Sequence, residues 1–219
     1  MSRVSAVFVF FILLTLGCLT PGMEMEQLRA RYAADGQRAF RQGGYSEARE
    51  HFSAALRIAP NDCELLFGLG RCAEAEGKKT DAEEIYRRVV EIRPDYAEAR
   101  RARTNLLIAT GRRSDAEREV KTWLADRPQS ASAYVEDGWL LLQAGDVDSA
   151  RGRFQQALDL NPRDARAMVE LGRVYERLDH PGRAAELYRR SLALQSDQPE
   201  IRERLSSLEK AGFNAAKPD

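Results

Sequence analysis

The chain has 219 residues, of which 43% are hydrophobic, so it carries enough apolar material to form a sizeable folded core. Its 34 basic side chains are balanced by 34 acidic ones, which gives a formal net charge of zero. A neutral chain has no basic field that attracts nucleic acid, so nucleic acid is not an expected partner.

The N-terminal segment, residues 1–22, is predicted to be a signal peptide or a membrane anchor. One early cation, Arg3, precedes an uncharged apolar run over residues 4–16, a pattern typical of a secretory signal. The run ends in LTLGC, residues 14–18, which resembles a bacterial lipobox, although a threonine stands where that motif has an aliphatic residue. The resemblance makes Cys18 the candidate lipidation site.

Two alternatives to lipidation are an ordinary signal that is cleaved and an anchor that stays in the membrane. Residues 4–23 form an uncharged stretch of 20 residues, a length that spans a bilayer as a helix. With Arg3 on one side and Glu24 and Glu26 on the other, the flanking charges favour an N-terminus inside the cell. We therefore expect an exported protein, attached to the outer membrane or to the periplasmic face of a membrane in preference to a freely soluble one.

A period of 34 residues organises the rest of the chain, and such a period is the signature of a helical repeat array. Three columns keep this spacing: Pro60, Pro94, Pro128 and Pro162; Ala48, Ala82, Ala116, Ala150 and Ala184; and Gly43, Gly77, Gly111 and Gly145. A fourth column contains Gly70, Gly138 and Gly172, and Thr104 interrupts it.

The residues within one period predict two helices. Gly77 and its equivalents stand where a first helix must end, because glycine tolerates the left-handed backbone conformation. Three residues after these glycines come the predicted N-caps of the second helix, Thr80, Ser114 and Asp148. The proline ends that second helix, since it lacks a backbone donor and disfavours a helical residue before it.

The repeat resembles that of the tetratricopeptide repeat (TPR) family, and the best match is ASAYVEDGWLLLQAGDVDSARGRFQQALDLNPRD, residues 131–164. The resemblance implies an all-α fold, a right-handed superhelical solenoid of five helix pairs. The array is placed at residues 23–211, with repeats at 29–62, 63–96, 97–130, 131–164 and 165–198 and a capping helix at 199–211. Residues 212–219 are predicted to be a flexible tail.

The sequence contains no recognisable catalytic or metal-binding constellation, so we expect no enzyme activity, no cofactor and no metal site. His51 and His180 have no nucleophile or carboxylate at a motif spacing and are interpreted as surface residues. Cys63 and Cys72 lie nine residues apart on one predicted helix, roughly half a turn out of phase, so they cannot easily pair. They are interpreted as small, half-buried residues, because a metal site would need more ligands.

One face of each first helix is predicted to bind a partner. This face lies roughly 130° from the packing positions on a helical wheel, and in the TPR family it lines the concave groove. The candidate partner-binding residues on it are Phe67, Arg71, Arg101, Asn105, Val135, Trp139, Leu142 and Arg173. Trp139 is the candidate apolar anchor, and an equal alternative is that it packs between adjacent first helices.

These features predict a non-catalytic scaffold for protein–protein interaction at the bacterial cell envelope, which binds a segment of a protein or peptide partner in the groove. The domain plan resembles that of exported TPR lipoproteins that assist pilus or secretion-pore assembly. The alternative is an exported accessory to a cell-wall enzyme, which binds that enzyme or its substrate polymer. The sequence specifies neither the identity of the partner nor the oligomeric state.

Overall fold

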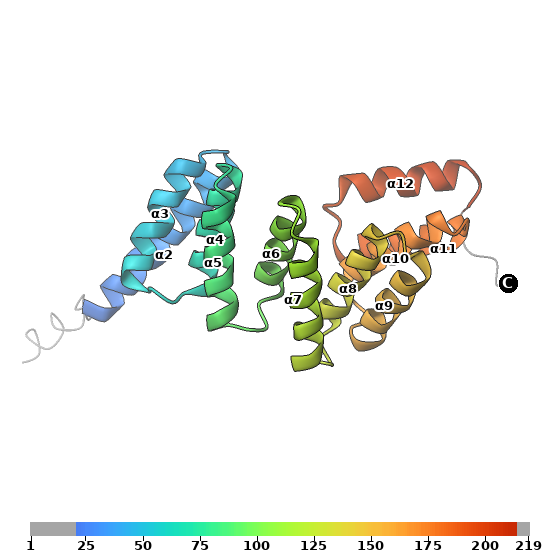
Figure 1. Cartoon of the computed structure of the whole chain (residues 1–219). Coiled ribbons are helices and arrows are strands. Elements are labelled where there is room, and N and C mark those ends of the chain that lie inside the picture. The colour runs from blue at the N-terminus through green and yellow to red at the C-terminus, as the bar shows by residue number, and fades with distance from the viewer. Residues whose placement is uncertain (1–20, 214–219) are drawn as a thin grey trace, which may run out of the picture. The chain divides into compact units, whose positions relative to one another are not determined.

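All regular secondary structure in residues 21–213, the part of the chain that the computed structural model describes, is helical. Eleven helices lie in this part, and Figure 1 shows them following one another along the chain as helical hairpins. The predicted all-α fold is therefore confirmed for these residues. None of the helices between residues 21 and 213 is long and apolar enough to cross a membrane. Cys18 and the rest of the predicted signal segment up to residue 20 lie outside the described residues.

The helices form two compact units, residues 21–103 and 104–213, and the chain passes from one to the other within α6 (Ala97–Ala109). The first unit contains α2 (Pro21–Arg41), α3 (Tyr45–Ile58), α4 (Cys63–Ala75), α5 (Lys79–Ile92) and the first half of α6. The second contains the rest of α6, α7 (Arg113–Asp126), α8 (Ala131–Gln143), α9 (Val147–Leu160), α10 (Ala165–Arg177), α11 (Pro181–Leu194) and α12 (Pro199–Lys210).

The turn between the two helices of a pair is built on glycine. Gly77 has a φ of 77°, and the N–H of the next residue, Lys78, donates to the carbonyl of Ala73 at 2.8 Å, which closes the end of α4. The equivalent glycines also have positive φ: Gly43 at 80°, Gly111 at 77° and Gly145 at 86°. The predicted role of this column is confirmed, because only glycine adopts this conformation without a steric penalty.

The predicted N-caps of the second helices are wrong by two residues. The observed caps are Lys78, Arg112 and Asp146. Only the third of these has a side-chain cap, in which the Asp146 carboxylate accepts from the N–H of Ser149 at 3.1 Å. The glycine turn reverses the chain so tightly that the residue directly after the glycine is already the cap. The predicted caps therefore lie inside the first turn of their helices: Thr80, Ser114 and Asp148.

The first helices are capped by residues two positions after the repeated proline. Asp62 Oδ1 accepts from the N–H of Glu64 at 3.0 Å and from that of Leu65 at 3.2 Å, which satisfies two donors at the start of α4. Ser130 and Asp164 cap α8 and α10, each accepting from one backbone N–H, those of Ala133 and Ala167. The same column holds Tyr96 before α6, so one repeat has an aromatic residue where the others have a cap.

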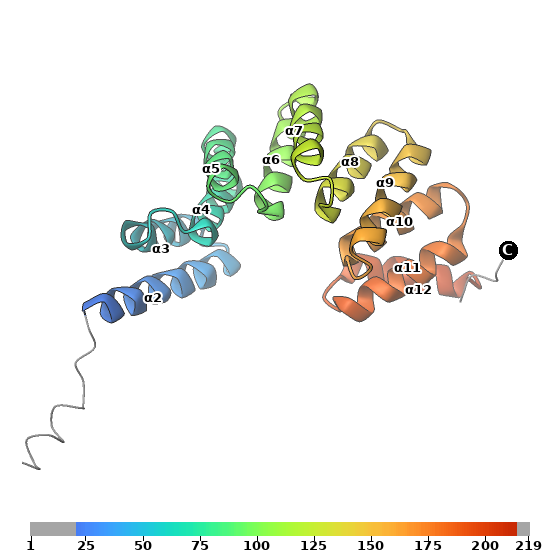
Figure 2. The same ribbon diagram turned by 90° about the horizontal axis from the view of Figure 1, so that it is seen from below.

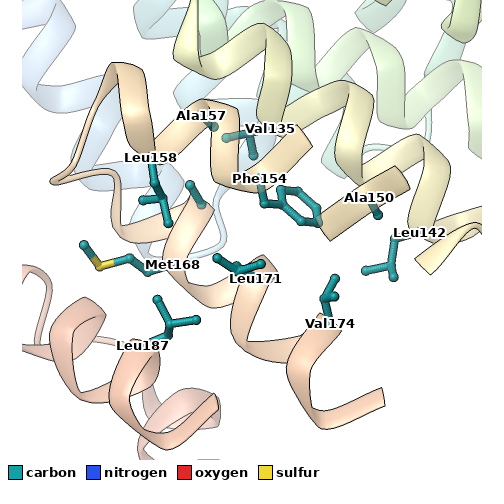
Figure 3. Packing of buried hydrophobic residues seen from close by; sticks show 11 residues of the cluster. Val135, Leu142, Ala150, Phe154, Ala157, Leu158, Met168, Leu171, Val174 and Leu187 are labelled. Atoms are coloured by element: carbon teal, nitrogen blue, oxygen red, sulfur yellow. The ribbon is translucent and has the colours of Figure 1, made fainter. Parts of the chain in front are cut away.

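Each unit has its own core. In the second unit Figure 3 shows side chains of α8, α9, α10 and α11 directed toward one another, with the ring of Phe154 beside Val135. Beyond this cluster, Ile201 and Leu205 of α12 pack against Tyr188 and so cover the apolar face of the last helix pair. A repeat array needs such a cover, because a helix pair cannot bury both of its apolar faces alone.

Candidate partner-binding pocket

A pocket of about 810 Å³ lies on the first helices of the first unit. Helices α2 and α4, whose places in the fold Figure 2 shows, supply most of its lining. The rest comes from Phe52 of α3, from the link between α5 and α6, and from Glu98 at the start of α6. The lining residues are Gln37, Phe40, Arg41, Phe52, Glu64, Phe67, Gly68, Arg71, Arg93, Asp95, Tyr96 and Glu98. The volume falls within the range of pockets that bind ligands in proteins, and the lining combines aromatic rings with charged groups.

The centre of the pocket is aromatic. The ring of Phe67 lies 5.3 Å from that of Tyr96 and 5.6 Å from that of Tyr86, measured between centroids, and both pairs are tilted. This is the separation at which aromatic pairs attract one another. Phe67 packs between two other rings and is half-buried, so it offers a fixed apolar surface to a ligand.

A hydrogen-bonded polar cluster, in which Arg93 Nε alone is buried without a hydrogen-bond partner, lies beside these rings. The Arg93 guanidinium pairs with Glu64 at 2.8 Å and stacks over the Tyr96 ring, 4.1 Å from its centroid. The Tyr96 hydroxyl donates to the other oxygen of Glu64 at 2.5 Å. That hydrogen bond, aided by Arg93, lowers the pKa of Glu64, whereas burial and the neighbouring carboxylate raise the pKa of Tyr96. At neutral pH the cluster therefore consists of a carboxylate, a guanidinium and a neutral phenol that bind one another.

A different arrangement is found at the α2 and α4 wall. The Arg71 guanidinium lies 4.2 Å from the centroid of the Phe40 ring, a distance typical of a cation–π contact. Arg71 is exposed, and no carboxylate of residues 21–213 lies within ion-pair distance of it. The ring orients this cation without neutralising its charge.

The pocket offers aromatic rings and charged groups that suit recognition of a ligand. Its described lining contains no serine, threonine, cysteine, lysine or histidine, and its ionisable groups are three carboxylates, one tyrosine and three arginines. Within residues 21–213 no group of three or more histidine, cysteine, aspartate or glutamate side chains is placed to hold a metal ion. These residues can bind a ligand through stacking, charge and hydrogen bonds.

Two of the eight predicted partner-binding residues lie in this pocket, and the others do not. Phe67 and Arg71 are brought together on its wall. Arg101 is half-buried on α6 outside the pocket lining, and Asn105 is exposed further along the same helix.

Trp139 and Arg173, in the second unit, are both engaged in contacts within that unit. Trp139 is half-buried and packs against the cluster that contains Leu107 and Leu140. Arg173 forms ion pairs with Glu170 at 3.1 Å and Glu200 at 3.0 Å. The packing alternative for Trp139 thus has direct support from its contacts, and the charge of Arg173 is neutralised from within the chain.

The predicted groove face is wrong at Val135 and Leu142. Their side chains are 1% and 4% exposed, and Figure 3 shows both in the core of the second unit. The physical reason is that α9 and α10 pack over the part of α8 that a helical wheel assigned to the groove. In the first unit the equivalent position of Val135 is the half-buried Phe67, which lines the pocket.

The other ten lining residues were missed from the sequence, and Phe40, Arg93 and Tyr96 show why. Phe40 lies one period before Glu74, which follows Phe67 and Arg71 on the predicted face of the same helix. Extending this face to the first repeat therefore identifies Phe40. Tyr96 breaks the column of helix caps, and this departure from the repeat was the available signal. Arg93 carried no signal of its own, because its role depends on Glu64, 29 residues away.

A second pocket, of about 590 Å³, lies in the second unit between α9, α10 and α11. Its lining includes Leu158, Tyr175, Leu187 and Arg190. None of the eight predicted residues lines it, and it lies mainly on the second helices of the repeats, whereas the first pocket lies on first helices.

Comparison with known proteins identifies the family. Two tetratricopeptide-repeat models match the chain, one at residues 34–97 and 135–199 and the other at residues 73–135. Because the first model alone matches more than half of the chain, the protein belongs to the tetratricopeptide repeat family. No match was found among curated proteins.

Solved structures share the fold. TTC0263, a thermophilic TPR protein of Thermus thermophilus, is 21% identical, covers 83% of this chain and 99% of its own, and has a TM-score of 0.66. The pilF protein of Pseudomonas aeruginosa is 18% identical, with 87% of each chain covered and a TM-score of 0.60. At these identities the likeness concerns the fold, and TPR proteins are in general scaffolds for protein interaction.

Proposed function

We propose that this protein is a non-catalytic scaffold that binds a segment of a partner protein in the pocket of its first unit. The observation that carries the proposal is the pocket itself, where the aromatic surface of Phe67 lies beside an arginine, Arg71, that has no acidic partner within the described chain. Aromatic and arginine side chains are the residues most enriched at binding hot spots. A chain segment is a suitable ligand, because the lining combines aromatic rings with positively and negatively charged side chains.

We further propose that the scaffold acts at the bacterial cell envelope and that the N-terminal segment attaches it to a membrane. Support comes from the sequence alone: the apolar run after Arg3 and the lipobox-like LTLGC at residues 14–18. A lipid on Cys18 would need at least two acyl chains for stable attachment. The alternative function is that of an exported accessory to a cell-wall enzyme, or of a secretion or pilus assembly factor, bound through the same pocket.

The pocket is tested by site-specific crosslinking with the full-length chain in membranes. A photoreactive amino acid is placed at Gln37 or at Arg71, both exposed in the pocket, and at Arg57 as a control. Arg57 is an exposed residue of α3 in the same unit and does not line the pocket. We expect one protein adduct from the pocket positions and none from Arg57. Adducts from Arg57 alone, or none from either pocket position, would contradict the proposal.

The attachment is tested separately by labelling with a fatty acid. We expect the wild-type chain to be labelled and to sediment with membranes, and Cys18→Ala to lose the label. A label that persists in Cys18→Ala would exclude this cysteine as the lipidation site. Identification of the crosslinked protein then separates the alternatives. A wall hydrolase would indicate an accessory to a cell-wall enzyme, and a component of a pilus or secretion pore would indicate an assembly factor.

A further inference from the structure

One wall of the pocket, formed by α2 and α4, is positively charged. Arg71 on α4 and Arg41 at the end of α2 are exposed, and neither has an ion-pair partner among the residues that the structure describes. The third arginine of the lining, Arg93, is neutralised by Glu64 at 2.8 Å. The α2 and α4 wall therefore carries two positive charges that form no ion pair within the described chain.

The opposite wall is negative. Asp95 in the α5–α6 link and Glu98 in the first turn of α6 line the same pocket and are exposed. Neither forms an ion pair with any residue between 21 and 213. Acidic groups suit the start of a helix, so Glu98 is stabilised where it lies without needing a cation from the chain.

Aromatic side chains, held in place by their neighbours, lie between the two walls. Phe67 and Tyr96 lie there with ring centroids 5.3 Å apart, and the nearby Arg93, Glu64 and Tyr96 groups bind one another. Most polar atoms of these groups therefore already have partners, although Arg93 Nε is buried and forms no hydrogen bond within the described chain. A ligand therefore meets a cationic wall, an aromatic centre and an anionic wall in that order.

We propose that the pocket selects a protein segment that carries an acidic side chain for Arg41 and Arg71, a bulky apolar side chain for Phe67 and Tyr96, and a basic side chain for Asp95 and Glu98. This inference rests on the proposed function and adds the chemistry and the polarity of the partner. Arginine binds carboxylates through charge-assisted hydrogen bonds, and complementary charges fix the direction in which a segment lies. A segment with the reverse order of charges would place like charges together at both walls.

The probe is a random library of twelve-residue peptides, selected on the immobilised full-length chain. We expect the retained peptides to share an acidic residue, an aromatic or large aliphatic residue and a basic residue in that order, or in the opposite chain direction. Synthetic copies are then measured by fluorescence anisotropy. Double reversal, Arg41→Glu with Arg71→Glu, is expected to weaken such a peptide by about tenfold or more. The same variant should bind more tightly a peptide in which the acidic residue is replaced by lysine.

Matched controls lie on α3 of the same unit. Arg57→Glu and Glu50→Lys reverse exposed charges that line no part of the pocket and that form no ion pair within the described chain, and they should leave peptide binding unchanged. The double variant Asp95→Lys with Glu98→Lys should bind a peptide with the basic residue more weakly than the wild type does. It should bind a peptide that lacks the basic residue as well as the wild type does. Melting temperatures of all variants show that each one is folded.

The possible outcomes separate the inference from the proposed function. Peptides that crosslink at Gln37 but ignore both charge reversals, or that carry no shared order of charges, overturn the inference and leave the pocket as the binding site. A library that yields no peptide crosslinking at Gln37 contradicts the proposed function itself. Retained peptides whose preference changes with the reversal at Arg41 and Arg71, and not with the control at Arg57, establish the inference.

Discussion

Gly70 of α4 lies so close to Tyr86 of α5 that a Cβ atom on the glycine would be 2.5 Å from Cε1 of the ring. No real Cβ atom approaches another carbon this closely, so the two helices can pack here only because the side chain is absent. The same relation, glycine to an aromatic ring 16 residues later, recurs in Gly36 and Phe52, Gly138 and Phe154, and Gly172 and Tyr188. The glycine column of the sequence thus records a close helix approach.

We predict that Gly70→Ala destabilises the protein. The added methyl group forces the Tyr86 ring to move, and overpacking of this kind costs about 1–3 kcal/mol. Alanine gains up to about 1 kcal/mol of helix propensity over glycine, so the net loss should be about 1 kcal/mol. Urea denaturation measures it. The control is Gly152→Ala in α9, where nothing lies within 4 Å of the added Cβ, so that this variant should gain stability. Equal effects of the two variants would contradict the packing argument.

Replacing Asp179 with glycine should stabilise the fifth repeat. Asp179 is one period after Gly145 and has a φ of 59°, whereas the equivalent positions of the other repeats hold glycine. A non-glycine residue in this region is strained, and its release should contribute about 0.5–1 kcal/mol. The reverse change, Gly145→Asp, should cost a similar amount. Thermal unfolding of both variants checks the prediction, and a fall in stability of Asp179→Gly would show that the aspartate side chain stabilises the turn.

Glu136 and Arg166 form an ion pair that a single substitution should break at high cost. The Glu136 side chain is 1% exposed, and Arg166 Nη2 lies 2.7 Å from its Oε2. Arg166→Met leaves a buried carboxylate without its partner, which costs about 3 kcal/mol. Glu136→Leu with Arg166→Met removes both charges and should restore much of the loss.

The exposed pair of Arg87 and Glu91, 2.6 Å apart on α5, provides the control. Arg87→Met should cost about 0.5 kcal/mol or less, because water screens this pair. Chemical denaturation of these variants and the wild type measures the coupling. If the double variant is as unstable as Arg166→Met alone, the loss of stability comes from the packing of these side chains and not from the unpaired charge.

The two described cysteines should differ in reactivity. Cys72 is fully buried, and burial, aided by Glu76, raises the pKa of its thiol to about 11, so only about one molecule in a thousand carries the reactive thiolate at pH 8. Cys63 is half-buried at the start of α4, and burial also raises its pKa. We expect iodoacetamide at pH 8 to modify Cys63 before Cys72, and both rates to rise with pH as the thiolates form.

Peptide mapping by mass spectrometry follows each cysteine separately. In guanidinium chloride, where burial is lost, the two should react at similar rates. Modification of Cys72 in the folded protein as fast as that of Cys63 would contradict the burial of this thiol.

Much of the helical architecture was predictable because it depends on local chemistry that recurs. The 34-residue period and the glycines at positive φ are properties of short stretches, and they specified helix pairs and their turns. The N-caps show the limit of such local signals. The sequence predicts Thr80 as an N-cap, but the tight turn at Gly77 lets the helix begin before Thr80. The sequence predicts that a helix begins after the glycine, and the geometry of the turn determines at which residue it begins.

Which face of each first helix meets solvent was decided by tertiary packing. Val135 and Phe67 occupy the same column, yet one is buried in a core and the other lines a pocket, because neighbouring helices cover one and not the other. Thr104 shows the same dependence: it replaces a glycine and is 2% exposed, and Val120, 16 residues later, is smaller than the aromatic residue of the other repeats. A periodic sequence determines that each first helix presents the same kinds of face. Whether a side chain on such a face is buried depends on helices that are distant in the chain. The pocket was therefore identified only in the folded structure.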